Sequence, residues 1–99
     1  MDFNKKEQHA IVSVLIAIME ADGVIHPNET SYLNKILSAF SMLESEIEDI
    51  PPFDSVATPL TLKIMTENKK KEARKILAGM AGCDGYSDPR EIKIIDSIF

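Results

Sequence analysis

An internal repeat constrains this chain more strongly than any other feature of its sequence. The pattern Asp-Gly-x-x-x-Pro-x-Glu occurs at Asp22–Glu29 and again at Asp84–Glu91. Apolar residues on both sides of the pattern keep the spacing that separates the two copies: Val14 with Ile76, Leu15 with Leu77, Ile18 with Met80, Leu33 with Ile95, and Ile36 with Ile98. The sequence therefore predicts two helix–loop–helix units that pack about an approximate two-fold axis.

Helix breakers and apolar spacing predict about five helices in the chain. Apolar residues recur near every 3.6 positions, and no alternating run long enough for a strand is present. We expect helices over residues 4–22, 27–41, 59–66, 68–83 and 89–99. The chain is therefore expected to be all-α.

The length of the chain suits a single domain. Its 99 residues, 44% of them apolar, can bury about 65% of the surface that the unfolded chain exposes. We expect one domain over residues 1–99, with a first repeat at about 4–41, a connector at 42–58 and a second repeat at about 59–99. The connector is acidic and contains Pro51-Pro52, which cannot continue a helix. It has room for one short helical turn at 44–49.

The first predicted helix is apolar almost all round. Asn4 and Glu7 match a capping box at its start. Its apolar residues are Ile11, Val12, Val14, Leu15, Ile16, Ile18 and Met19. Such a helix lies at the centre of a domain or in a dimer interface, and we expect the centre. The apolar residues of the third predicted helix are Leu60, Leu62, Ile64 and Met65.

Two residues of each motif have a structural role without any ligand. Gly23 and Gly85 follow the last apolar position of a helix, where a left-handed residue closes the C-terminus. Pro27 and Pro89 suit the first position of the next helix, where the missing N–H is no loss.

The acidic residues of the motif have two interpretations. Asp22 and Asp84 follow helix C-termini, where the dipole disfavours a carboxylate by about 0.3–1 kcal/mol. Together with Glu29 and Glu91, they would give a hard divalent cation (Ca²⁺, Mg²⁺, Mn²⁺ or Zn²⁺) four carboxylates. In the alternative, the aspartates accept N–H groups of a turn and the glutamates cap helices. An EF-hand is excluded, because its first ligand position holds Ile18 in one copy and Met80 in the other.

The two Asp-Gly loops at the ends of apolar helices resemble the TerB-like family, the tellurite-resistance proteins and their co-chaperone-linked relatives. The resemblance covers roughly residues 5–41 and 60–99, and Cys83 stands where the family usually has alanine. It implies an all-α fold of two helical repeats in which acidic loop residues take part in divalent-metal binding. Carried over to this chain, those residues are Asp22, Glu29, Asp84 and Glu91.

Basic residues gather in one part of an acidic chain. The net charge is −5, which argues against a nucleic-acid binder that neutralises phosphates. Residues 58–75 nevertheless carry an excess of bases. We interpret this run either as a solvated helix face or as a docking patch for a protein partner; its residues are Lys69, Lys70, Lys71, Arg74 and Lys75.

Features of an enzyme or of a membrane protein are not found in the sequence. Cys83 with His9 or His26 would make a thiolate pair, but Cys83 replaces Ala21 in the repeat and is better placed in the core. The longest apolar run, Ala10–Met19, is too short to span a bilayer, and no signal-peptide cleavage pattern follows it. We therefore expect a non-catalytic cytoplasmic protein, either a monomer or a homodimer.

Two functions remain open at this point. The first is a small TerB-like accessory module that binds a divalent cation and serves a stress, tellurite or metal response. The second is a protein-interaction adaptor without metal, in which the motif acids only form turns and caps.

Overall fold

The first helix begins where the capping box predicts. In the computed structural model, the backbone N–H of Asn4 donates to Glu7 Oε1 at 2.9 Å, and the N–H of Glu7 donates to Asn4 Oδ1 at 2.8 Å. These two bonds satisfy N–H groups that have no partner within the helix. The capping box at Asn4 is therefore confirmed.

The structure describes residues 3–20, 27–50, 57–82 and 89–98. In these ranges it contains six helices and no strand, which confirms the all-α prediction. The helices are α1 Lys5–Glu20, α2 Pro27–Ala39, α3 Glu44–Glu48, α4 Ala57–Lys63, α5 Glu67–Ala81 and α6 Pro89–Ile98. None of these helices is both long enough and apolar enough to cross a membrane.

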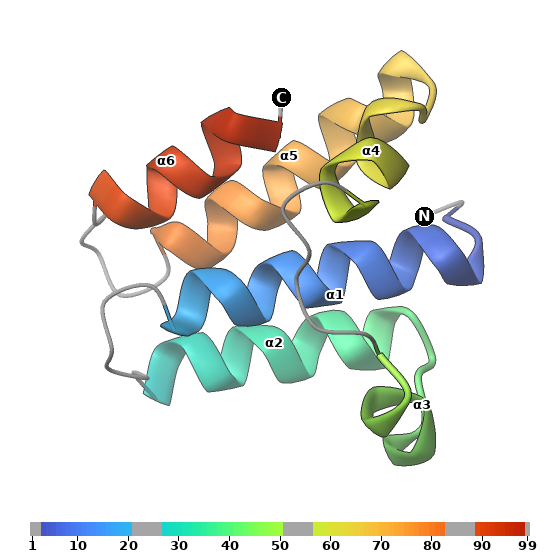
Figure 1. Ribbon diagram of the computed structural model, residues 1–99. Coiled ribbons are helices and arrows are strands. Elements are labelled where there is room, and N and C mark those ends of the chain that lie inside the picture. Colours follow the sequence, from blue (N-terminus) through green and yellow to red (C-terminus); the bar gives the residue numbers. More distant parts are fainter. Residues whose placement is uncertain (1–2, 21–26, 51–56, 83–88, 99) are drawn as a thin grey trace.

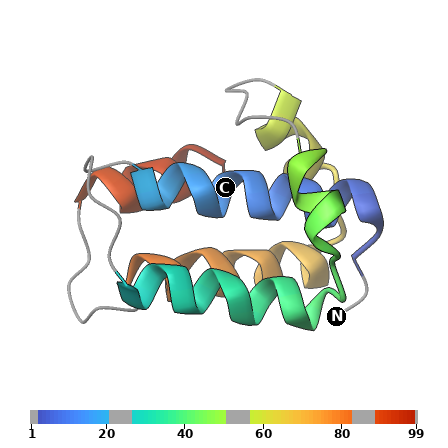
Figure 2. The ribbon, with the colours of Figure 1, turned by 90° about the horizontal axis from the view of Figure 1, so that it is seen from below.

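The four longest helices form two layers. Figure 2 shows α1 beside α6 in one layer and α2 beside α5 in the other. The helices α1 and α5 run in one direction, and α2 and α6 return in the opposite direction (Figure 1). The starts of the helices keep the spacing of the two motifs, because the step from Lys5 of α1 to Glu67 of α5 equals the step from Pro27 of α2 to Pro89 of α6.

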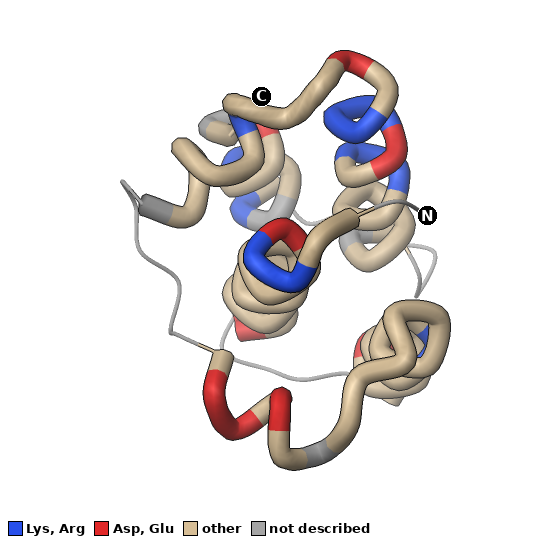
Figure 3. The backbone as a smooth tube through the Cα atoms, turned by 90° about the vertical axis from the view of Figure 1, so that its right-hand side faces the viewer, with Lys and Arg blue, Asp and Glu red and all other residues tan. Residues whose placement is uncertain are grey.

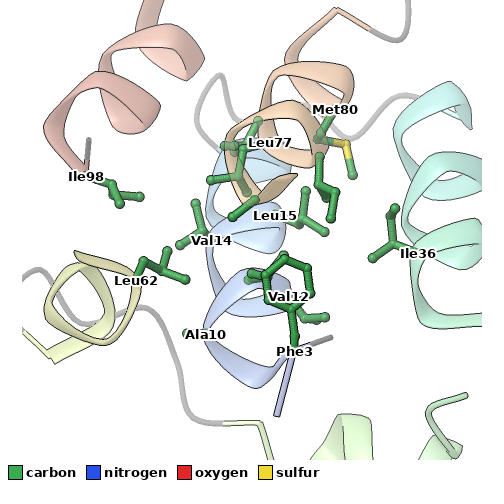
Figure 4. Packing of buried hydrophobic residues seen from close by; sticks show 14 of the residues in the cluster. Phe3, Ala10, Val12, Val14, Leu15, Ile36, Leu62, Leu77, Met80 and Ile98 are labelled. Carbon is green, nitrogen blue, oxygen red and sulfur yellow. The ribbon is translucent and has the colours of Figure 1, made fainter. Parts of the chain in front are cut away.

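Helix α1 lies at the centre of the core, as its sequence predicts. It packs against α2, α4, α5 and α6. Its Ile11, Val12, Val14, Leu15 and Ile18 side chains are all 0% exposed, although they point to different sides of the helix. Figure 4 shows Leu62 of α4, Leu77 of α5 and Ile98 of α6 converging on it. The resulting radius of gyration, 12.4 Å, matches the value of about 12.6 Å expected for a compact domain of this length.

A close approach joins α2 to α5. The Tyr32 hydroxyl of α2 donates to the backbone carbonyl of Ile76 at 2.7 Å. Gly79 lies one turn further along α5, and a Cβ atom at this position would collide with the Tyr32 hydroxyl. Glycine inside a helix costs about 1 kcal/mol relative to alanine, and the space that it leaves lets the tyrosine reach the α5 backbone.

The region around α4 differs from the sequence prediction. The helix begins at Ala57 and ends at Lys63, and Thr66 caps α5 instead of ending α4, because its side chain accepts from the Lys69 N–H. Leu60 and Ile64 are 58% and 73% exposed, whereas Leu62 is fully buried. The two exposed residues are two positions from Leu62 on either side, so they point to the opposite face.

The two equivalent leucines of the core provide a test of the packing. Changing Leu15 or Leu77 to Ala should lower the free energy of unfolding by about 2–5 kcal/mol each, because both side chains are fully buried. Urea denaturation followed by circular dichroism measures this. Leu60→Ala is the matched control and should change stability by less than about 0.5 kcal/mol. Equal effects of all three substitutions would contradict the observed core.

Candidate functional site

The helix ends that flank the two motifs gather at one end of the molecule. The last residues of α1 and α5 and the first residues of α2 and α6 lie together at the left of Figure 1. Both α2 and α6 begin at the proline of the motif, as predicted. The two copies of the motif are therefore joined to the same end of the bundle.

The four predicted metal ligands are described to different extents. Asp22 and Asp84 lie outside the described residues, as do Gly23 and Gly85. Glu91 belongs to the first turn of α6, and its side chain lies outside the description too. Glu29 is the third residue of α2, and only 2% of it is exposed. Its carboxylate is buried at this end of the bundle and is not without a partner.

The described residues do not by themselves assemble a metal site. Nowhere in these ranges do three His, Cys, Asp or Glu side chains come close enough together to hold an ion. Cys83 and His26 lie outside the described residues, and His9 lies on α1, 3.9 Å from Glu46 of α3. The metal interpretation therefore depends on residues of the two loops.

A different site is built from basic side chains. A cavity of about 480 Å³ opens between the end of α4, the first half of α5 and the end of α6. We call it the cationic groove. It is lined by Lys63, Glu67, Lys70, Lys71, Arg74 and Ile98.

The charges in the cationic groove are only partly compensated. Among the described residues that line the groove, four are cationic and one, Glu67, is a carboxylate. Lys70 pairs with Glu67 and Arg74 with Asp96, each at 3.4 Å. Within the described part of the chain, neither Lys63 nor Lys71 has an ion-pair partner, and both are exposed.

The structure divides the predicted docking patch. The exposed ends of Lys70, Lys71 and Arg74 line the groove. Lys69 points away from it, because its amine donates to Glu7 Oε1 of α1 at 2.9 Å, and Lys75 lies 3.6 Å from Glu72 on its own helix. Three of the five predicted residues therefore line one groove. Figure 3 views the backbone from the end of the bundle where α4 meets α5, with the basic positions in blue.

Lys63 is a basic residue of the groove that the predicted patch did not include. It ends α4, a separate helix, and only the packing of α4 beside α5 brings it to the groove. The signal available in the sequence was the excess of bases over residues 58–75, which begins with Lys63.

Two exposed apolar side chains lie close to Lys63 in the sequence, and we call them the apolar ridge. Leu60 lies three residues before Lys63, and Ile64 lies directly after it. Both side chains are largely exposed. Leu60 and Lys63 share one side of the helix, since residues three apart are neighbours. The site therefore presents positive charge and an adjoining apolar surface together.

Comparisons of this chain with protein-family models, with curated proteins and with solved structures find no match.

The pair between Glu7 and Lys69 gives the protein a pH-dependent stability. Burial raises the pKa of the Glu7 carboxyl, but the Asn4 N–H and the Lys69 amine together outweigh it, so the pKa lies below its ordinary value of 4.5. A carboxyl with a lowered pKa stabilises the fold above the pKa of the unfolded state, and this contribution is lost as the pH falls through the folded value.

We expect Glu7→Gln to reduce the loss of stability between about pH 7 and about pH 3. Glutamine still completes a capping box, so the substitution removes the charge and leaves the cap. Urea denaturation at several pH values measures the effect. Glu72→Gln, at an exposed pair on α5, is the control and should keep the pH dependence of the wild type. An unchanged pH dependence in Glu7→Gln would contradict the assignment.

Proposed function

We propose that this protein is a non-catalytic interaction module whose cationic groove binds an acidic, partly apolar segment of a protein partner. The observation that carries the proposal is the gathering of four cationic side chains among the described residues of one groove, in a chain whose net charge is −5. A surface of this kind selects partners by charge complementarity.

The apolar ridge favours a protein segment over a nucleic acid. Leu60 and Ile64 offer no partner to a phosphate backbone, whereas they suit an apolar side chain of a peptide. The acidic remainder of the chain also repels an extended polyanion. Lys63 and Lys71 are the central contacts, because neither is engaged by a carboxylate of the described residues.

Replacing the two unengaged lysines tests the groove. We expect Lys63→Glu/Lys71→Glu to weaken the binding of a fluorescent peptide of Glu, Asp and Leu at least about tenfold, a loss of about 1.4 kcal/mol. Fluorescence anisotropy at low salt measures the dissociation constant, and added salt should weaken binding by the wild type.

The control for this experiment has the same change in net charge. Lys35→Glu/Lys93→Glu alters two exposed lysines that do not line the groove, and it should bind the peptide almost as the wild type does. A peptide with Gln and Asn in place of Glu and Asp should bind weakly to every variant. If the control loses as much affinity as the groove variant, net charge and not the groove governs binding, and the proposal is wrong.

A second candidate function is that of a TerB-like accessory module that binds a divalent cation in a stress, tellurite or metal response. Three observations favour it: the equal spacing of the helix starts in the two halves, the gathering at one end of the bundle of the helix ends that flank both motifs, and the burial of Glu29 there. The pair between Glu7 and Lys69, which are separated by this same spacing, supports two pseudo-symmetric repeats. The ligands of the cation would be Asp22, Glu29, Asp84 and Glu91.

Divalent ions test this second candidate. Ca²⁺, Mg²⁺, Mn²⁺ or Zn²⁺ at about 100 times its dissociation constant should stabilise the wild type by about 2.7 kcal/mol. Asp22→Asn/Asp84→Asn should remove this stabilisation and leave the metal-free protein about as stable, since Asn also serves in turns. Thermal unfolding with each ion measures both effects. If none of the ions stabilises the wild type, the metal hypothesis is wrong, and the motif acids act only as turn and cap residues.

A further inference from the structure

We propose that the cationic groove takes the acidic α3 segment of a second copy of this chain, so that copies associate head to tail. The inference rests on the proposed function of the groove and names its partner. It follows from the position and charge of one segment, residues 43–49, which we call the α3 segment.

The α3 segment has the composition that the groove selects. Leu43 is 66% exposed, and the Glu48 and Asp49 side chains are exposed as well. Across the part of the chain that the structure describes, neither of these two carboxylates is joined to a basic residue. One exposed apolar side chain therefore accompanies two available negative charges, which matches Lys63, Lys71 and the apolar ridge in the groove.

The α3 segment is also held in place on its own molecule. Lys5 of α1 donates to Glu46 Oε2 at 2.9 Å, and this contact holds the pKa of the Glu46 carboxyl below its usual range. Ile47 and Ile50 pack against the core. A surface that is already ordered loses little conformational entropy when it binds.

Groove and α3 segment lie on opposite sides of α1. Figure 1 shows α4 and the start of α5 above α1 and α3 below it, and the end view of Figure 3 places the basic coils at the top and the acidic turns at the bottom. The two surfaces of one molecule therefore cannot meet, and their contact has to join two molecules. Because the two surfaces lie on opposite sides of the molecule, two copies cannot make both contacts with each other, so the association does not close at a dimer; it continues as a chain or a ring.

Sedimentation velocity at rising protein concentration tests this arrangement, at about 20 mM and about 500 mM salt. The groove variant Lys63→Gln/Lys71→Gln and the α3 variant Glu48→Gln/Asp49→Asn each remove one surface. At low salt the wild type should form species larger than a dimer, and each variant alone should remain a monomer. An equimolar mixture of the two variants should form dimers and nothing larger, since one intact groove then meets one intact α3 segment.

Three results would overturn the inference. The wild type could stay monomeric at low salt, the groove variant or the α3 variant could associate as the wild type does, or the mixture of these two variants could stay monomeric. Lys35→Gln/Lys93→Gln is the control and should associate as the wild type does. Binding of the acidic peptide by the monomeric α3 variant, measured separately, reports on the groove itself. A monomeric wild type that binds this peptide refutes self-association alone, whereas one that does not bind it refutes the proposed function too.

Discussion

The burial of α1 is the constraint on which the rest of the structure depends. A helix that is apolar on every side is stable in water only when other helices cover its whole circumference. In this protein α2, α4, α5 and α6 do so. The helices α2, α5 and α6 pack along α1, and α4 covers the remaining side of α1 near its start. The position of α4 beside the start of α5 is thus a consequence of covering α1.

The cationic groove arises from this same requirement. Leu62 anchors α4 on α1 and is fully buried, which leaves Leu60 and Ile64 on the outer face and sets Lys63 opposite the basic face of α5. Lys69 does not contribute to the groove. Its amine pairs with the Glu7 carboxylate and so joins the start of α5 to the start of α1. Neighbouring lysines of one run therefore differ in their contacts: Lys69 pairs with Glu7, whereas Lys70 and Lys71 line the groove.

The opposite charges of the protein are kept apart by the same central helix. The groove lies on one side of α1 and the α3 segment on the other, with Lys5 holding α3 in position. Because of this separation, the basic residues of the groove cannot pair with the carboxylates of the α3 segment in the same molecule. The end of the bundle that joins both motifs is a third region, distinct from the groove.

The sequence by itself determined the all-α class, the capped start of α1, the helix starts at Pro27 and Pro89, and the central place of α1. These features depend on local hydrogen bonding, on the fixed backbone of proline and on the distribution of apolar residues along one helix, all of which a sequence records directly. Which lysines share a surface was decided only by the tertiary structure. Lys63 and Lys71 belong to different helices, and Lys69 leaves its neighbours for the Glu7 carboxylate in the other half of the chain, because side chains meet according to how helices pack and not according to their order in the chain.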